Sequence, residues 1–441
     1  MEKGRVRRRV PAAPACACLV TALLAACGAR AVSSSDGGGG GGALQAAFGV
    51  TNSVGDAPLM VVFDDDSQGD VTSWSWDFGD GASSHEHAPV HTYTTAATYS
   101  VTLTVAGPQG SAVRTRGDLV RVLDGERIGI WTRADELVRL PTSGAAWNSL
   151  SAEANRAIGS PNLANQDDDA DQVVLAKALV YARTGAPAMR DAVVAACLAA
   201  IDTELGGRTL ALGRNLVAYV VSADLVGLSA QDDAVFRAWL GRCRTEVLDG
   251  KTLVSTHEER PNNWGTHAGA SRAAIAAYLG DAAELERCAR VFRGWLGDRT
   301  AYAGFQWGDG SWQADAARPV GIDPRGAARD GHSLDGVLPD DQRRAGPYAW
   351  PPPKENYVWE ALQGALAQAV ILSRQGYDTW EWSDQALLRA VTWLYGPCAF
   401  PAAGDDTWLP HVINHFYAAD FPAPVPASPG KNLGWTDWTL Q

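Results

Sequence analysis

The chain has 441 residues, of which 46% are hydrophobic and 20% charged, and its formal net charge is −13. This length exceeds what one compact domain usually takes, and the hydrophobic fraction is sufficient to bury more than one core. The negative charge argues against nucleic acid as a partner, because a phosphate backbone requires a basic face. It also means that an anionic substrate would need a locally positive cleft.

Residues 1–27 have the pattern of an export signal, in which basic residues precede an apolar stretch too short to span a membrane. The stretch ends in Leu24-Ala25-Ala26-Cys27. This ending resembles a lipobox, in which the cysteine is acylated after cleavage. We therefore expect an exported protein, anchored by lipid on Cys27 at the cell surface or on a periplasm-facing membrane. The alternative is an ordinary signal peptide in which Cys27 is incidental. Residues 28–44, rich in glycine and serine, predict a flexible linker.

Residues 45–124 predict a β-sandwich, because short alternating runs such as 99–105 are separated by turn signals. The motif Trp76-Asp77-Phe78-Gly79-Asp80-Gly81, followed by His91-Thr92-Tyr93, closely resembles a PKD domain. Its glycines suit positive φ and Asp80 can bond its own turn amides, so we expect the motif to be structural. The resemblance implies a spacer, or a weak contact with carbohydrate or protein, and no chemistry.

Residues 130–441 change to helical periodicity. We expect helices of 12 to 20 residues joined by short turns, typical of antiparallel hairpins that close or half-close into an (α/α) toroid or incomplete barrel. Ser229 and Asp232 form a capping signal. The expected helical segments are 168–182, 193–201, 216–228, 229–248, 266–279, 281–296, 355–374 and 384–394.

Four cysteines lie beyond the predicted signal, and their wide spacing with no CxxC pair argues against a zinc cluster. We expect buried free thiols, although an oxidising compartment would also permit a disulfide. These residues are Cys197, Cys243, Cys288 and Cys398.

The segment from His257 to His267 places Asn262, Asn263 and Trp264 before an apolar helix. Polar groups at a helix start can face an anion, or they can simply cap the helix. The segment resembles the Asn-Asn-His stretch of the alginate lyase family, whose fold is an (α/α) toroid. Asn263 matches the second Asn of that stretch. The histidine of the family is replaced here by Trp264, so we assign its role to His267.

Two later segments extend this resemblance to roughly residues 210–400. The stretch 307–313 resembles the Asp-Gly-Ser stretch of the same family, and 355–362 resembles its tyrosine-containing helix. Between them lies a long irregular stretch, 318–353, and a loop of that length is more often functional than not.

The resemblance implies a polysaccharide lyase that cleaves a uronic-acid polymer such as alginate or glucuronan by β-elimination, without metal or other cofactor. The carboxylate must be neutralised, a base must take the C5 proton and an acid must protonate O4. We expect Asn263 and His267 to bind the carboxylate and His332 to be the base, because imidazole titrates near neutral pH. Tyr357 or Tyr348 is the acid or shared acid and base, and Arg344 holds the carboxylate or favours the ionised tyrosine.

The expected partners are an anionic polysaccharide and, through lipid, a membrane, and we expect a monomer. Indole rings in loops can stack on sugars. The residues expected to contact substrate are Arg214, Asn215, Asn262, Trp264, Trp312, Arg343 and His415.

Two alternatives stay open. A glycoside hydrolase on an (α/α) scaffold would need two carboxylates across the bond; Asp309, Asp330, Asp335 and Asp340 could supply them. A surface protein that binds glycans without cleaving them would use the sandwich and the tryptophans.

Overall fold

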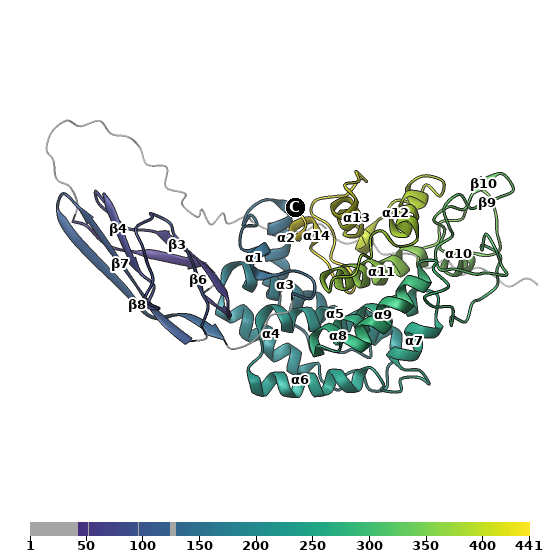
Figure 1. Cartoon of the computed structure of the whole chain (residues 1–441), viewed down its shortest axis with the longest axis horizontal. Coiled ribbons are helices and arrows are strands. Elements are labelled where there is room, and N and C mark those ends of the chain that lie inside the picture. Colours follow the sequence, from purple (N-terminus) through teal and green to yellow (C-terminus); the bar gives the residue numbers. More distant parts are fainter. Residues whose placement is uncertain (1–42, 52, 96, 124–128) are drawn as a thin grey trace, which may run out of the picture. The chain divides into compact units, whose positions relative to one another are not determined.

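The computed structural model describes residues 43–51, 53–95, 97–123 and 129–441. The predicted export signal with Cys27, and nearly all of the predicted linker, lie outside the described residues. Within them, a β-domain is followed by a predominantly helical domain (Figure 1), and the predicted order of the two is confirmed.

The β-domain consists of two sheets. One has the order β1 (Phe48–Thr51), β3 (Leu59–Asp65), β6 (Val90–Tyr93) and is antiparallel. The other has the order β2 (Val54–Asp56), β8 (Gly110–Leu123), β7 (Ala97–Gly107), β4 (Ser73–Asp77), β5 (Ser83–Ser84). Alternate residues of these strands form one apolar core, in which Val61, Phe63, Trp76 and Leu103 are completely buried.

The Trp76–Gly81 motif shapes a turn of this domain. Asp80 accepts a hydrogen bond from the amide of Ala82 at 3.0 Å and contacts His91 Nε2 at 2.7 Å. Gly79 has φ +81°, and a Cβ there would lie 2.4 Å from the carbonyl oxygen of Ser100. The motif therefore has the structural role predicted for it.

Three long helices occupy the centre of the helical domain and pack side by side: α5 (Thr209–Val226), α8 (Asn263–Leu279) and α11 (Tyr357–Arg374). Glycine permits their close approach. A Cβ on Gly213 of α5 would lie 2.9 Å from the Ala268 amide, and one on Gly364 of α11 would lie 2.4 Å from the His267 amide. By length and hydropathy α5 could cross a membrane, but all of it is buried inside this domain, as in a core helix.

Other helices surround this centre. Helix α3 packs on α5, and α4, α6, α7 and α9 cover the other sides. Near the C-terminus, α11 packs on α13, α13 packs on α14, and α14 packs on α2. The region after the β-domain is thus predominantly helical, as predicted. The bounds are α1 (Ala134–Leu137), α2 (Ala145–Ala154), α3 (Ala170–Thr184), α4 (Pro187–Ala199), α6 (Ala230–Cys243), α7 (Leu253–Glu259), α9 (Ala282–Trp295), α10 (Pro339–Gln342), α12 (Trp382–Tyr395), α13 (Leu409–Tyr417) and α14 (Thr436–Thr439).

Local signals explain several helix ends. Ser229 caps α6, as predicted, by accepting from the amide of Asp232 at 3.2 Å. Helix α8 begins three residues earlier than expected, since Asn262 is its N-cap. The first turn requires glycine at position 265, because a Cβ there would lie only 1.8 Å from the Arg260 carbonyl oxygen. The four cysteines from Cys197 onward are free and buried, which confirms the predicted thiols.

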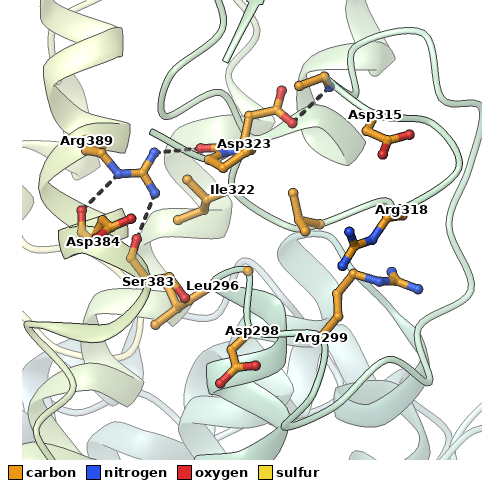
Figure 2. A pocket seen from close by; sticks show the side chains of 14 residues that line it. Leu296, Asp298, Arg299, Asp315, Arg318, Ile322, Asp323, Ser383, Asp384 and Arg389 are labelled. Atoms are coloured by element: carbon orange, nitrogen blue, oxygen red, sulfur yellow. Dashed lines mark hydrogen bonds between the residues drawn. The ribbon is translucent and has the colours of Figure 1, made fainter. Parts of the chain in front are cut away.

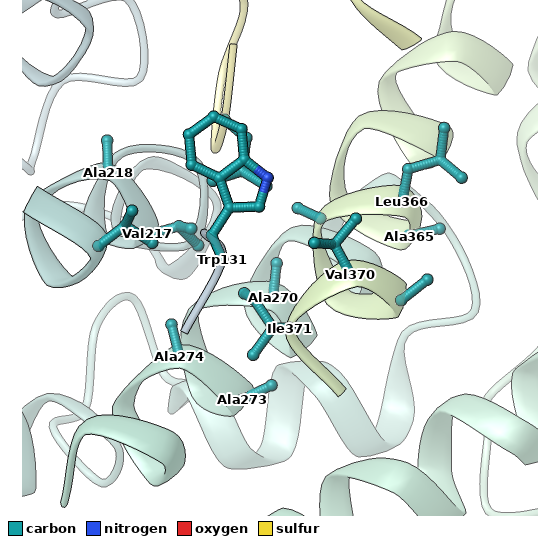
Figure 3. Packing of buried hydrophobic residues seen from close by; sticks show 14 of the residues in the cluster. Trp131, Val217, Ala218, Ala270, Ala273, Ala274, Ala365, Leu366, Val370 and Ile371 are labelled. Atoms are coloured by element: carbon teal, nitrogen blue, oxygen red, sulfur yellow. The ribbon is translucent and has the colours of Figure 1, made fainter. Parts of the chain in front are cut away.

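Trp131 fills the space where the three central helices meet (Figure 3). Its side chain is 1% exposed and lies among residues of α5, α8 and α11, including Val217, Ala274 and Val370. The indole therefore ties the segment before α1 to the core of the helical domain.

We predict that Trp131→Ala lowers the free energy of unfolding of the helical domain by ~3–5 kcal/mol, because it removes a large buried side chain and leaves a cavity. Chemical denaturation followed by circular dichroism at 222 nm measures this. Val235→Ala, at a position that is 51% exposed, is the control and should change stability little. A Trp131 variant as stable as the control would show that the indole contributes no packing energy.

Candidate functional site

The N-terminus of α8 is held by two aspartates of α10. The amide of Asn263 donates to Asp341 Oδ1 at 3.1 Å, and Asn262 Nδ2 donates to Asp340 Oδ2 at 3.2 Å. The Oδ1 atom of Asn262 accepts from the Trp264 amide at 3.2 Å. The backbone and capping groups of the asparagine pair are therefore used internally, and the side chain of Asn263 is buried, 1% exposed, with its Oδ1 toward Arg344.

Arg344 links Asn263 to α11. It lies in the 3-10 helix η1 (Arg343–Ala345), and its Nη1 donates to Asn263 Oδ1 at 3.2 Å. The guanidinium carbon lies 3.3 Å from the centre of the Tyr357 ring. Arg344 is exposed, and in the part of the chain that the structure describes no carboxylate lies within ion-pair distance of it. Amide, guanidinium and phenol thus converge, with unused donors on the guanidinium.

Glu360 follows Tyr357 by three residues, so both lie on one face of α11. Its Oε2 lies 3.1 Å from Arg214 Nη1 and 3.8 Å from His267 Nε2. Burial disfavours the charged form of Glu360, but the positive charge of Arg214 outweighs that effect and its pKa is lowered. We regard Arg214 as the main partner because it is nearer. The sequence did not single out Glu360, although its spacing from Tyr357 was a usable signal.

His267 is completely buried and does not reach the surface. Burial lowers the pKa of its imidazole, which is therefore neutral. Its Nδ1 lies 2.6 Å from Asn432 Oδ1, while Asn432 Nδ2 donates to the Gly213 carbonyl oxygen at 2.9 Å. Since the amide nitrogen is already donating, Nδ1 carries the proton and Nε2 presents a lone pair toward Glu360. The prediction that His267 binds the substrate carboxylate directly does not fit this burial.

His332 and Tyr348 form a separate group in the irregular stretch. His332, in β10 (His332–Ser333), stacks on Trp350 with ring centres 4.1 Å apart; β10 pairs with β9 (Ala328–Arg329). Tyr348 donates to the Arg329 carbonyl oxygen at 3.1 Å. Among the described residues, no hydrogen bond, ion pair or ring contact joins this group to Asn263 or Tyr357.

Several expected substrate contacts lie elsewhere. Trp312 is completely buried and donates to the Gly346 carbonyl oxygen at 3.0 Å, so it cannot stack on a sugar without rearrangement. Asn215 is also buried, and its Nδ2 donates to the Asn165 carbonyl oxygen at 2.8 Å. His415 is exposed on α13, with its Nδ1 3.3 Å from the Leu440 carbonyl oxygen.

Trp264 and Arg343 flank the convergence of Asn263, Arg344 and Tyr357. Trp264 is half-buried, with the Arg260 guanidinium 5.3 Å from its ring centre. Arg343 is bound to Asp340 at 2.9 Å and lies 3.5 Å from Asp309, so it is occupied where its neighbour Arg344 is not. Of the two arginines, Arg344 is thus the one with donors available to a ligand.

Comparisons with known proteins agree with the two-part architecture. The family model for the PKD domain matches residues 47–122. The PKD1 domain from the Vibrio cholerae metalloprotease PrtV is 34% identical, with 19% of this chain and 99% of that domain covered and a TM-score of 0.17. The PKD1 domain of Vibrio anguillarum Epp is 33% identical, with 19% and 100% covered and the same TM-score of 0.17. Residues 47–122 belong to the PKD domain family.

A short part of this chain also resembles a longer curated protein. Pre-pro-metalloprotease PrtV of Vibrio cholerae serotype O1 is 51% identical over 47 residues, which are 11% of this chain and 5% of that protein. The chain therefore spans only a small part of the length of this relative.

The family model for alginate lyase matches residues 186–309. The match supports a polysaccharide lyase at the level of the family. It includes Arg214, Asn263 and His267 and ends before Arg344 and Tyr357. The structure adds these last two residues to the matched segment through the contacts of Arg344 with Asn263 and Tyr357.

Asp406 lies behind the site, where Gln363 Nε2 donates to its Oδ1 at 2.8 Å. Burial raises its pKa to about 7. Because the unfolded carboxyl titrates near ~4, the folded state retains a proton that the unfolded state has lost between those pH values. The stability contributed by this neutral form is therefore present at low pH and is lost as the pH rises from ~4 to 7.

We predict that Asp406→Asn, which keeps a neutral side chain, makes the fall of stability between pH 4 and 7 shallower than in the wild type, by at most ~1.4 kcal/mol per pH unit. Denaturant titrations at a series of pH values measure this slope. The exposed neighbour Asp405, changed to Asn, is the matched control. Parallel curves for the wild type and Asp406→Asn would contradict the assignment of a neutral acid.

Proposed function

We propose that the helical domain cleaves a uronic-acid-containing polysaccharide, such as alginate or glucuronan, by β-elimination without a metal ion. The observation that carries this proposal is the convergence of Asn263, Arg344 and Tyr357, in which an exposed guanidinium, with no carboxylate partner among the described residues, bridges an amide and a phenol. The alginate lyase family match supports the class of reaction.

The reaction needs three functions. The C5 proton is too weakly acidic to leave while the adjacent carboxylate is fully charged, so hydrogen bonds and positive charge must stabilise the developing enolate. A base then removes the C5 proton, the C4–O4 bond breaks with its electron pair going to O4, and an acid protonates O4. The products are a sugar with a double bond between C4 and C5 and a chain with a new hydroxyl end.

In our proposal the exposed Arg344 binds the carboxylate, and the buried Asn263 acts on it through the amide oxygen that accepts from Arg344. Tyr357 protonates O4, because its ring lies against the Arg344 guanidinium that would hold the carboxylate of the sugar. The same phenol or His332 takes the C5 proton. Glu360, Arg214 and His267 act behind them as positioning residues.

The hydrolase alternative is weakened by what the aspartates already do. Asp340 accepts from the Gly308 amide at 2.9 Å and pairs with Arg343. Asp335 pairs with Arg389 at 2.8 Å and accepts from the Gly326 amide. Asp309 accepts from the Ser311 amide at 3.1 Å, and Asp330 has φ +51° beside the turn of the β9–β10 hairpin. Through these contacts the carboxylates of Asp309, Asp335 and Asp340 serve loop structure.

We further propose that the chain is exported and anchored by lipid on Cys27, with the PKD domain as a spacer. The support is the lipobox-like sequence and the glycine-rich segment that follows it. Metabolic labelling with a fatty acid in an expressing bacterium, compared with Cys27→Ala, tests the anchor.

We predict that Tyr357→Phe lowers kcat/KM on uronans by ~10²–10⁴-fold, because it removes a proton-transfer group and leaves the ring. The assay follows the ultraviolet absorbance of the unsaturated product on alginate, glucuronan and related polymers. Tyr348→Phe is the matched control, and His332→Ala tests whether a separate base is used.

Nearly full activity of Tyr357→Phe would overturn its role. New reducing ends without absorbance would establish a hydrolase, and binding without either product would establish a glycan-binding protein.

A further inference from the structure

A cavity of about 350 Å3 lies apart from the cluster of Asn263, Arg344 and Tyr357 and shares none of its residues. It is bounded by the end of α9, by the loop 314–324 and by the start of α12 (Figure 2). Its volume falls within the range of ~300–1,000 Å3 that is typical of small-molecule sites.

Two arginines lie on one side of this cavity. The Arg299 Nη1 donates to the carbonyl oxygen of Pro319 at 2.6 Å, which places its guanidinium beside the residue that follows Arg318. Figure 2 shows both side chains directed to the same region. Among the described residues, neither has a carboxylate within ion-pair distance. Two guanidiniums without anionic partners favour a carboxylate or a similar anion.

The opposite side carries hydroxyl and carboxylate groups on a strained turn. Ser383, Asp384 and Gln385 have φ of +51°, +57° and +55°. This is the left-handed region, which residues other than glycine rarely occupy. Arg389 holds this turn by donating to the carbonyl oxygens of Ser383 and Asp384, both at 3.0 Å. Strained backbone of this kind is concentrated at functional sites, and here it places the Ser383 and Asp384 side chains along the cavity wall.

The floor is apolar except for one buried acid. Leu296, Val320 and Ile322 supply aliphatic surface. Asp323 is completely buried; its Oδ1 accepts from the Ala314 amide at 3.0 Å, and its Oδ2 has no hydrogen-bond partner in the described part of the chain. Burial raises the pKa of Asp323 to about 8, so at neutral pH it is a carboxylic acid that could donate.

We propose that this cavity is a second, non-catalytic site that binds a uronate residue of an oligosaccharide. The carboxylate of the sugar would lie on Arg299 and Arg318, its hydroxyls would face Ser383 and Asp384, and the apolar face of its ring would lie on Leu296 and Ile322. Asp298, Asp315 and Asp384 also line the cavity, so a simple inorganic anion, which has no hydroxyl groups to donate to these carboxylates, fits less well than a sugar acid. The choice of a uronate rests on the proposed function, whereas the cavity itself does not.

The test measures binding by calorimetry on the full chain carrying Arg344→Ala, which weakens carboxylate binding at the proposed catalytic cluster. The probes are a mannuronate disaccharide, a glucuronate disaccharide, neutral cellobiose and inorganic phosphate. We expect a uronate disaccharide to bind, cellobiose to bind at least tenfold more weakly, and Arg318→Ala to weaken uronate binding at least tenfold. Arg139→Ala, a change of another exposed arginine, is the matched control.

Equal binding by the Arg318 variant and its control would overturn the proposal, and so would phosphate that binds as tightly as the uronates. Because Arg318 is exposed, loss of folding is not expected, and a thermal melt checks this. If wild-type protein leaves all uronans uncut but uronate binding still depends on Arg318, the proposed function fails and this site stands. If wild-type protein cleaves a uronan but uronate binding does not depend on Arg318, only the proposed second site is wrong.

Discussion

The hydrogen bonds from the start of α8 to Asp340 and Asp341 are the constraint on which the site depends. They join segments 78 residues apart and fix η1, so that Arg344 reaches both Asn263 and Tyr357. Two adjacent buried carboxylates would repel each other if both were charged. Burial raises the pKa of Asp341 well above its usual range, while Asp340 is paired with Arg343. Asp341 is thus neutral and Asp340 is compensated by Arg343, so both side chains can remain buried.

A second constraint is the close packing of α5, α8 and α11, which places His267 and Glu360 behind the exposed groups. Glycines at 213 and 364 allow α8 to touch both neighbours, and the C-terminal segment brings Asn432 against His267. The imidazole is therefore held in one tautomer by a residue 165 positions away. The neutral, buried His267 and the ion pair of Glu360 with Arg214 support α11 rigidly. Tyr357 lies on the first turn of this helix.

Local signals in the sequence predicted a considerable part of this arrangement. The alternation of the strands, the Trp76–Gly81 turn, the Ser229 cap and the helical pattern each depend on residues close together in the chain. Asn262 was recognised as a possible cap for the same reason. The burial of His267, Trp312 and Asn263 could not be predicted, because the helices and loops that cover them come from remote segments. The role of Asn432 had no local signal at all.

The most direct test of the account is a double-mutant cycle between Asn263 and Arg344. The kcat/KM on the best uronan is measured for wild type, Asn263→Ala, Arg344→Ala and the double variant, with melts to check folding. If both side chains hold one carboxylate, the effects are non-additive, with a coupling of ~0.5–3 kcal/mol. Strictly additive effects would contradict a shared carboxylate site, and so would full activity in both single variants.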